Sequence, residues 1–496
     1  RSGLAIEEWA DRLAQARIRL ILDSEGTALA AREAHLNLLR LKSLPGWAEY
    51  HAVDVTNRAA VAELVKSVVA RLGRVQLVVH GAGVQYSKRL PKRKLGELQQ
   101  TIDTKLLGLQ NLYAALRYLD DHTNLEATAG RAEGLSLDRM RRLVSVLGDP
   151  QLAYPVIHIT GTNGKGSVAR MVTSLLEACG LSVGTYTSPH LEAINERISW
   201  NGEAIADDDL AAVIGQVAAV EELAGVVPSY FEILTAAAFT WFADVAVDVA
   251  VIEVGMGGRW DATNVADGAV AVLTNIGRDH TDGVGAWREA IASEKAGIVK
   301  PGATFVCGET SADLRPLLAD TDAAETWWRG EQFDAEASRL ALGGRTVSLR
   351  TPSGTIDDVF VPLHGDHQAD NAAVALAAVE ALFDRRLDDE VVTEGFASVR
   401  VPGRFEVVAR HPTIVLDAAH NLDGARACRR TLDEEFTLGG SLVLVVGFLA
   451  GKDPTEMLEA IGAVDAGFLV ACTPDSPRAV PAAEVAAAAD RLGIVA

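Results

Sequence analysis

The stretch Pro155–Cys179, PVIHITGTNGKGSVARMVTSLLEAC, decides how the rest of the chain is organised. It opens with an apolar, β-branched run, residues 156–160, which predicts a buried strand. The loop GTNGKGS, residues 161–167, follows this strand. Apolar residues then recur at helical spacing up to Gly180, which stands where a helix C-cap is expected. The stretch therefore predicts a strand, a glycine-rich loop and a helix in succession.

This arrangement is typical of a phosphate-binding loop. Glycines let backbone N–H groups approach phosphate oxygens, the helix N-terminus contributes the positive end of its dipole, and Lys165 supplies a cation. The spacing departs from the usual P-loop because Gly166 separates Lys165 from Ser167. A structural turn is the alternative reading of the bare pattern. The flanking strand and helix favour a nucleoside triphosphate site.

Length, charge and cysteine usage set limits on the class of protein. A chain of 496 residues predicts two or three domains. Its net charge of −21 argues against broad binding to nucleic acid or to anionic membranes. The four cysteines are scattered without a CxxC pair, no apolar run reaches the roughly 18 residues of a membrane span, and the N-terminus has no signal sequence. We expect a cytoplasmic monomer with no zinc site.

Polar residues follow three further predicted strands. Ser188 follows the strand 182–186, Glu253 ends the very apolar strand 247–252, and His280 follows the strand 269–275. Because the carboxyl ends of parallel strands face the ligand crevice of an α/β sheet, we expect these side chains near the phosphate loop. A buried carboxylate such as Glu253 is costly unless it is paired or binds a metal. Ser188 could equally be part of a Ser-Pro turn, and a lone histidine is usually structural.

The remaining chain completes two α/β domains. Lys295 lies in a predicted helix and, without further context, reads as a solvated surface lysine. Short alternating runs at about 301–360 predict a small antiparallel lobe, and Asn371 opens the Ala-rich helix after it. Beyond a linker at residues 401–405, strands 413–416, 442–446 and 468–471 alternate with helices, as in a Rossmann-like domain.

The first 113 residues differ from the rest. The strand end AVDVTN at 52–57, the helix 59–71 and the turn GAG at 81–83 resemble the middle of a short-chain dehydrogenase, with Lys105 at the position of its active-site lysine. No glycine-rich first βα turn precedes them, so the pyrophosphate of a dinucleotide would have no cradle. We predict a non-functional partial segment without oxidoreductase activity. The alternative is an NADP-binding reductase fusion.

From about residue 114 to the end, a series of motifs closely resembles folylpolyglutamate synthase/dihydrofolate synthase, a branch of the Mur ligase superfamily. The motifs in chain order are GTNGKGS, YTSPH, SYFE, EVGMGGRWDATN, RDHT, SEKAGI, HQADNA, VPGRF and LDAAHN. The resemblance implies an α/β fold with a P-loop Mur-ligase-like nucleotide domain at 114–400 and a smaller Rossmann-like domain at 401–496. That family normally continues through a further strand and helix, so we expect the second domain to be cut short, leaving an apolar sheet edge exposed.

The resemblance also implies roles for individual residues. ATP would bind Gly161, Thr162, Asn163, Gly164, Lys165, Gly166, Ser167, Asn371, Arg404, Asp417 and His420. Two magnesium ions would be held by Ser188, Glu253 and His280. Lys165, His280 and Lys295 would be catalytic, and Lys295 matches the lysine that carries a carbamate in this family. The substrate-contacting residues would be Ser136, Ser229, Tyr230, Phe231, Glu232, Arg259, Asp261 and Asn264.

The implied activity is ATP-dependent addition of L-glutamate to dihydropteroate, to the γ-carboxylate of folates, or to both. The carboxylate would first take the γ-phosphoryl group of ATP to give an acyl phosphate, which the amine of glutamate then attacks. The segment at Ser136 matches the pteroate loop less closely than the other motifs match theirs. Alternatives are a Mur-type peptidoglycan ligase acting on a UDP-sugar substrate, and an inactive ligase that survives as a binding module.

Overall fold

The computed structural model describes residues 20–21, 50–51, 111–124, 136–278, 285–437 and 440–494. The chain divides into two compact units, Arg1–Asp121 with Ala206–Gly215, and His122–Ile205 with Gln216–Ala496. In the first unit, β1 (Leu20–Ile21) pairs in parallel with β2 (Tyr50–His51), and residues 111–120 are helical. The strand end, helix, turn and Lys105 that resemble a short-chain dehydrogenase lie outside the described residues.

The second unit is built on an eight-stranded sheet with the order β10-β9-β8-β3-β7-β4-β5-β6. The first six strands in this order are parallel and the last two pair antiparallel. Their bounds are β3 Val156–Thr160, β4 Val183–Tyr186, β5 Ile198–Trp200, β6 Glu203–Ala204, β7 Val249–Glu253, β8 Gly268–Leu273, β9 Thr304–Cys307 and β10 Glu325–Trp328. Every residue of β3 and β7 is buried, as their continuous apolar sequences predict.

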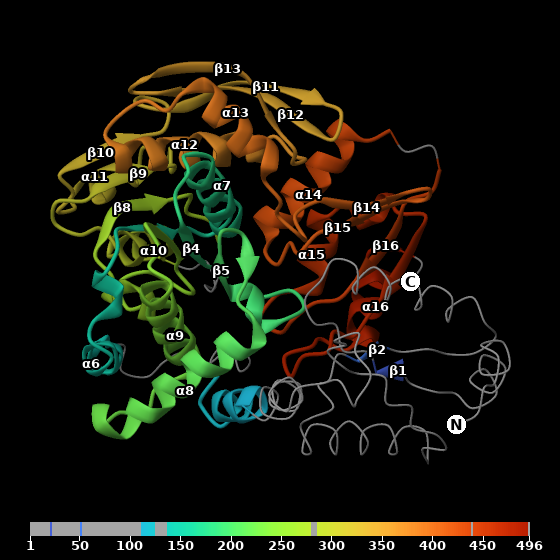
Figure 1. The fold of residues 1–496 in the computed structure, drawn as a ribbon. Helices are drawn as coiled ribbons and strands as arrows, with labels where there is room; N and C mark the ends of the chain where they lie inside the picture. The colour runs from blue at the N-terminus through green and yellow to red at the C-terminus, as the bar shows by residue number, and fades with distance from the viewer. Residues whose placement is uncertain are drawn as a thin grey trace, which may run out of the picture. The chain divides into compact units, whose positions relative to one another are not determined.

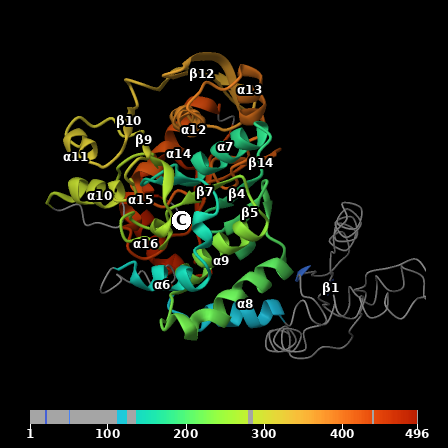
Figure 2. The ribbon, with the colours of Figure 1, turned by 60° about the vertical axis from the view of Figure 1, so that its left-hand side comes forward.

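Helices cover both faces of this sheet (Figure 1 and Figure 2). On one face, α7 (Lys165–Ala178) and α12 (His367–Phe383) share a hydrophobic core with β3 and β7, and α13 (Asp389–Ser398) packs beside α7. On the other lie α9 (Tyr230–Asp244), α10 (Trp287–Ala296) and α11 (Arg315–Ala319). The remaining elements of this region are α6 Asp138–Val146, η2 Pro150–Leu152, η3 Ile194–Arg197 and η4 Ala262–Val265, while α8 (Asp207–Ala224) is divided between the two units after residue 215.

The predicted small lobe is only partly correct. An antiparallel sheet of β11 (Asp334–Ala341), β12 (Gly344–Thr351) and β13 (Gly354–Val361) packs on α12. However, β9 and β10, which the prediction had placed in the lobe, belong to the main parallel sheet. Each is only four residues long, and so short a run does not reveal whether its partner is parallel or antiparallel.

Residues 403–494 form the second α/β region. The hairpin β14 (Glu406–Arg410) and β15 (Thr413–Leu416) precedes α14 (Leu422–Glu435), and β16 (Val443–Val446) pairs in parallel with β17 (Phe468–Ala471). The helices α15 (Pro454–Ala460) and α16 (Ala482–Arg491), with η5 (Ala463–Asp465), enclose a small core around Leu458 and Leu469. Val443 and Val445 on β16 and Phe468 on β17 are exposed, as expected for an uncovered apolar strand face.

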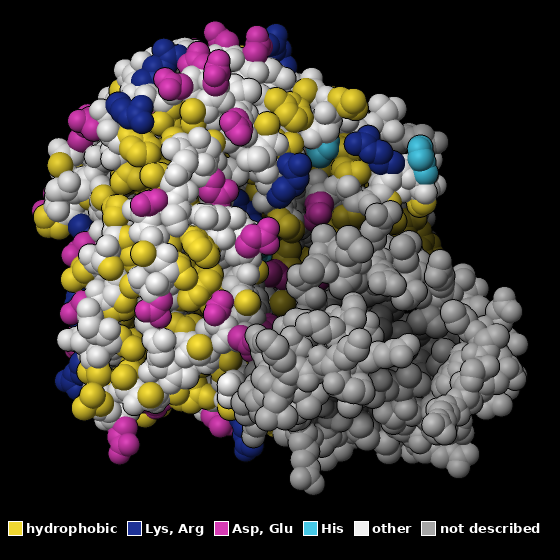
Figure 3. Space-filling view, in the orientation of Figure 1, with side chains coloured by type: hydrophobic (Ala, Val, Ile, Leu, Met, Phe, Trp, Pro, Cys, Tyr) yellow, Lys and Arg dark blue, Asp and Glu magenta, His cyan; other side chains and the backbone are white. Residues whose placement is uncertain are grey.

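Two surface properties bear on function. Among the described helices, none combines the length and the hydropathy that a transmembrane span requires. Over the part of the face that is described in Figure 3, Lys and Arg side chains are interspersed with Asp and Glu and with apolar side chains. Because the chain as a whole is acidic, a site for an anionic ligand is expected where basic side chains lie close together.

Candidate active site

The phosphate loop lies between β3 and α7, and neighbouring residues hold its shape. The N–H of Asn163 donates to Asn275 Oδ1 at 3.0 Å, and Thr274 Oγ1 donates to the Asn163 carbonyl oxygen at 2.6 Å. Gly161 has a φ of +148°, and a Cβ atom there would lie 1.8 Å from Thr274 Oγ1. Only glycine fits that position, so the polar end of β8 shapes the loop directly.

Two lysines converge on this loop. Lys165, the first residue of α7, donates from Nζ to the Gly161 carbonyl oxygen at 3.2 Å. Lys295 on α10 donates to the same oxygen at 2.8 Å and is only 7% exposed. The reading of Lys295 as a solvated surface residue is therefore wrong. The side-chain nitrogens of two lysines therefore meet at one carbonyl oxygen of the loop.

Glu253, at the end of β7, faces the same loop. Its side chain is buried, and Oε2 accepts a hydrogen bond from the Ser188 N–H at 3.3 Å. Burial raises the pKa of the Glu253 carboxyl, and the charge of Lys165 opposes that rise most strongly. The Ser188 N–H and the guanidinium groups of Arg404 and Arg170 lower the pKa further. A carboxylate at the end of a buried strand, beside the phosphate loop, is the kind of oxygen ligand that a divalent cation prefers.

Two of the three predicted magnesium ligands lie within the described residues. Ser188 and Glu253 lie side by side as predicted, whereas His280 is outside the described residues. Within the described ranges, no group of three His, Cys, Asp or Glu side chains could hold a metal ion. Hydroxyl and carboxylate oxygens are the ligands that magnesium prefers, so the two described residues fit this metal.

Asn371, near the start of α12, touches the phosphate loop from the side of the helices. It is buried and donates from Nδ2 to Gln368 Oε1 at 2.9 Å. A Cβ atom at Gly164 would lie 2.6 Å from Asn371 Oδ1, so the amide packs directly on the loop backbone. The prediction that Asn371 belongs to the ATP site is consistent with this position.

The second α/β region presents its predicted residues differently. Asp417 accepts the N–H of Phe405 and the N–H of Ala419, both at 2.8 Å, so its two carboxylate oxygens hold the linker turn. His420 is exposed, and its Nδ1 lies 3.2 Å from the Ala418 carbonyl oxygen. Arg404 donates to the Gly403 carbonyl oxygen at 3.3 Å and acts electrostatically on Glu253.

Asn421 is a site residue that the sequence analysis missed. It follows His420 directly, is 1% exposed, and donates from Nδ2 to Asn163 Oδ1 at 2.8 Å. The only sequence signal was its place as the last residue of LDAAHN, where it also caps α14. A contact between residues 258 positions apart cannot be read from local spacing.

The SYFE segment begins α9 and is largely structural. Ser229 and Glu232 form a capping box, in which Glu232 Oε2 accepts the Ser229 N–H at 2.7 Å. Glu232 Oε1 also accepts from Arg139 Nε on α6 at 3.2 Å. Phe231 lies against Tyr186, with 5.9 Å between the ring centroids. Ser136 Oγ accepts the N–H of Asp138, the first residue of α6, at 3.0 Å.

The glycine-rich segment after β7 turns two predicted substrate residues inward. Asp261 accepts the Met256 N–H at 2.8 Å and the Thr263 hydroxyl at 2.5 Å. Asn264 donates to the carbonyl oxygens of Arg259 and Gly297 at 2.9 and 3.0 Å. Both side chains are buried, so they shape the segment through its backbone.

The side chains that this segment exposes to solvent are those of Met256, Arg259 and Trp260. Arg259 donates from its guanidinium to the Ser293 carbonyl oxygen at 3.4 Å. Met256 and Trp260 are 46% and 42% exposed, and the sequence analysis had not selected either. Their large apolar side chains beside a run of glycines were the available signal.

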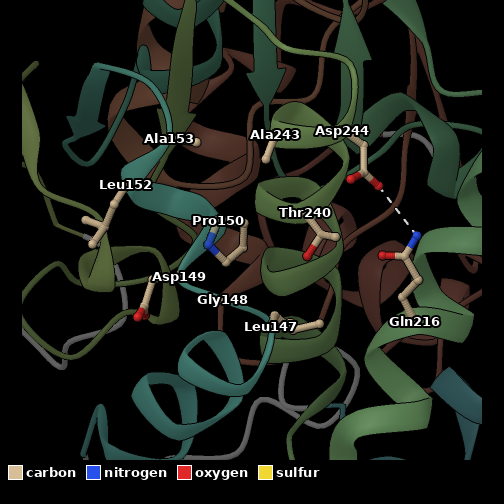
Figure 4. A pocket seen from close by; sticks show the side chains of 10 residues that line it. All are labelled: Leu147, Gly148, Asp149, Pro150, Leu152, Ala153, Gln216, Thr240, Ala243 and Asp244. Carbon is tan, nitrogen blue, oxygen red and sulfur yellow. Dashed lines mark hydrogen bonds between the residues drawn. The ribbon is translucent and has the colours of Figure 1, made fainter.

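A separate open pocket of about 510 Å³ lies beside η2 and the end of α9 (Figure 4). Asp149, Thr240 and Asp244 line it, and Gln216 Nε2 donates to Asp244 Oδ2 at 3.4 Å. None of the predicted site residues contributes to this pocket. The chemistry described above is therefore carried by the strand ends and not by the pocket.

Comparison with known proteins agrees with this geometry. A family model described as the Mur ligase middle domain matches residues 159–379, and one described as the Mur ligase, glutamate ligase domain matches residues 403–495. A short chain dehydrogenase model matches residues 2–127, which confirms the resemblance of the N-terminal segment. The fold and the site thus define a ligase of the Mur type.

Individual relatives narrow this class. The dihydrofolate synthase/folylpolyglutamate synthase of Mycobacterium tuberculosis is 43% identical over 383 residues, which is 72% of this chain and 78% of that protein. The structure of the Mycobacterium tuberculosis folylpolyglutamate synthase complexed with ADP superposes with a TM-score of 0.72 at 40% identity, over 78% of this chain and 87% of that chain. The chain belongs to the folylpolyglutamate synthase/dihydrofolate synthase family. The domain boundaries at 113 and 400 and the roles of single residues remain predictions.

Proposed function

We propose that this chain uses ATP to add L-glutamate to dihydropteroate, to the γ-carboxylate of folates, or to both, releasing ADP and phosphate. The observation that carries the proposal is the meeting of Lys165, Lys295 and Glu253 around one phosphate-binding loop. A bifunctional relative of known structure has Mn, AMPPNP and L-glutamate bound, with 30% identity and a TM-score of 0.66 over 76% of this chain and 87% of that chain. Its ligands are a nucleotide, a divalent metal and the proposed amino acid.

The chemistry explains the need for ATP. A carboxylate is a poor electrophile at neutral pH, because its delocalised negative charge makes the carbonyl carbon electron-rich and neither oxygen can leave as an oxide ion. Transfer of the γ-phosphoryl group to a carboxylate oxygen gives an acyl phosphate, whose carbonyl carbon the neutral amine of glutamate attacks. Phosphate then leaves with the oxygen that it took from the carboxylate. Positioning and charge neutralisation supply most of the catalysis in such transfers.

The phosphate loop is proposed to hold the triphosphate. Backbone N–H groups of residues 164–167, at the start of α7, would face its oxygens, and Lys165 would move from the Gly161 carbonyl oxygen to the phosphates. Asn371 supports the loop from behind at Gly164. Arg404 and His420 are proposed to reach the nucleotide from the second region, and Asp417 to act through the turn that it holds.

Ser188, Glu253 and His280 are proposed to hold two magnesium ions. Bound magnesium would neutralise charge on the triphosphate and orient it. The described residues supply the support for this assignment, since Glu253 is buried at a strand end beside Ser188. In the chain itself, the Ser188 N–H keeps the Glu253 carboxylate in a fixed orientation.

Lys295 is proposed to carry a carbamate. Its neutral amine would attack CO₂, forming an N–C bond and releasing a proton, and a cation would thereby become an anion. Lys165 and Lys295 share the Gly161 carbonyl oxygen, so their positive charges repel each other. A carbamate on Lys295 would turn this repulsion into attraction beside the metal site.

The substrate is proposed to lie between the start of α9 and the segment after β7. Tyr230, Phe231 and Arg259 are the contacts that we favour. Ser136, Ser229, Glu232, Asp261 and Asn264 act mainly by fixing the backbone there, as their hydrogen bonds indicate.

We also propose that the enzyme is a cytoplasmic monomer. All four cysteines are unpaired, which is typical of a reducing compartment.

The test is the release of ADP with dihydropteroate and with tetrahydrofolate, each with and without L-glutamate. We expect ADP release that requires glutamate and at least one of the two acceptors. Release with a UDP-muramoyl peptide but with neither pteroate nor folate would instead identify a peptidoglycan ligase. No release with any acceptor would contradict the proposal.

A further inference from the structure

Asn421 uses both ends of its side-chain amide. Its Oδ1 accepts the Gly424 N–H at 2.8 Å, which caps the N-terminus of α14. Its Nδ2 donates to Asn163 Oδ1 at 2.8 Å, which joins the second α/β region to the phosphate loop. With 1% of its surface exposed, the residue has no freedom to exchange these partners for water.

Asn163, the partner of Asn421 on the phosphate loop, has its backbone held in place by other residues. Its N–H and carbonyl oxygen are both committed to the end of β8, through Asn275 and Thr274. Its side chain is therefore the part of the residue that is left to meet α14. The pair joins the phosphate loop to the start of α14, whose other end is held separately by ion pairs of Glu435 with Arg345 and His364.

Residues near Asn163 and Asn421 also bring the first turn of α14 into contact with the phosphate loop. A Cβ atom at Gly277 would lie 2.7 Å from Asp423 Oδ2 and 3.3 Å from the Thr162 methyl carbon, so Gly277 lies between α14 and the loop. The Gly277 N–H donates to Thr162 Oγ1 at 2.9 Å. The first turn of α14 is thus seated on the loop at two points, and Asn421 is the one that forms a hydrogen bond with it.

We infer that Asn421 is a positioning residue, which seats the start of α14, and with it His420, against the phosphate loop through Asn163. The inference deepens the proposed function and rests on it for its kinetic part. Because the bond joins two neutral amides, its strength depends little on pH or salt. The end of α14 that this bond holds beside Asn163 is its N-terminus, which carries the positive end of the helix dipole.

The simpler reading is that Asn421 only caps α14. Three variants of the full chain separate the two roles. Asn421→Ser keeps a capping oxygen but is too short to reach Asn163, whereas Asn421→Ala loses both bonds. Asp453→Ala is the matched control, since Asp453 caps α15 in the same region by accepting the Thr455 N–H at 2.8 Å.

The measurements are the Kd of ADP, the KM of ATP, kcat and the thermal midpoint. Loss of one buried hydrogen bond predicts that Asn421→Ser weakens ADP binding and raises the KM of ATP by about 5- to 10-fold. Its thermal midpoint should fall less than that of Asn421→Ala, because the capping oxygen is kept. Asp453→Ala should lower the midpoint and leave the Kd of ADP unchanged.

A double variant provides the sharpest check. If the two amides act as a pair, Asn421→Ser in an Asn163→Ala background should weaken ADP binding no further. An ADP Kd that Asn421→Ser leaves unchanged or tightens, or an effect fully additive with Asn163→Ala, would overturn the inference. ADP binding is measurable even if no acceptor is turned over, so failure of the proposed function and failure of this inference are distinguishable.

Discussion

The two α/β regions that meet at the phosphate loop differ in how they hold their functional residues. In the first, β3 and β7 are buried along their whole length, and the residues at the strand ends bond to one another across the sheet. In the second, alternate residues of β16 are exposed, and Asp417 bonds only to nearby backbone groups. The first region therefore presents a preformed binding loop. The second completes the site by docking on it.

The largest effect is expected at the loop itself. Lys165→Ala removes the mobile cation and should reduce ATP turnover by about 10³-fold, because charge on the transferring phosphoryl group loses its stabilisation. Folding should be unaffected, since the Lys165 ammonium makes one partly buried bond to Gly161. Steady-state ADP release and a thermal melt measure both quantities. Unchanged ADP release would refute the assignment of the loop.

Gly161→Ala should damage the loop through its shape. The added Cβ would lie 1.8 Å from Thr274 Oγ1, so the end of β8 must move and the protein should lose about 2 kcal/mol of stability and most of its affinity for ADP. Gly215→Ala is the control, because a Cβ there meets nothing within 4 Å on α8. Denaturant unfolding and ADP titration give the comparison. Equal behaviour of the two variants would contradict a preformed loop.

A matched pair of valines tests the difference in burial directly. Val251→Thr on β7 places a hydroxyl in a fully buried position and should cost about 1–3 kcal/mol. Val445→Thr on β16, where the side chain is 67% exposed, should change stability by less than about 0.5 kcal/mol. Denaturant unfolding measures both. A comparable loss for Val445→Thr would show that its strand face is covered in solution.

The smallest effect is a pH dependence from Glu253. Because burial raises the pKa of this carboxyl above its ordinary 4.5, the ionised form is less favourable in the folded chain. Stability should therefore fall as pH rises from about 4.5 through the raised pKa, and stay level above it. Without metal, Glu253→Gln should raise the thermal midpoint at neutral pH, and the difference from the unmodified chain should shrink as the pH falls toward 4.5. A variant that is less stable at neutral pH would contradict this account.

The sequence was most informative where periodicity and burial agree. The runs 156–160 and 247–252 predicted fully buried parallel strands, and the residues after them, Lys165 and Glu253, were correctly expected to meet. Shared strand polarity explains this success, since it places every carboxyl end at one edge.

Side-chain direction and long-range contacts were harder to foresee. The motif around Asp261 suggested a substrate contact, yet its carboxylate turns back to the Met256 N–H. The Asn421–Asn163 bond depends on how two regions dock, which no local pattern encodes. Lys295 was recognised only through its family motif, because a lysine in a helix carries no signal of its burial.

The central claim is that this loop transfers the γ-phosphoryl group of ATP to a substrate carboxylate. The most direct measurement uses a pteroate or folate acceptor with ¹⁸O in the reacting carboxylate, followed by mass analysis of the inorganic phosphate released with glutamate. The account predicts one ¹⁸O atom in each phosphate, because phosphate leaves with an oxygen taken from the carboxylate. Unlabelled phosphate accompanying amide formation would contradict it.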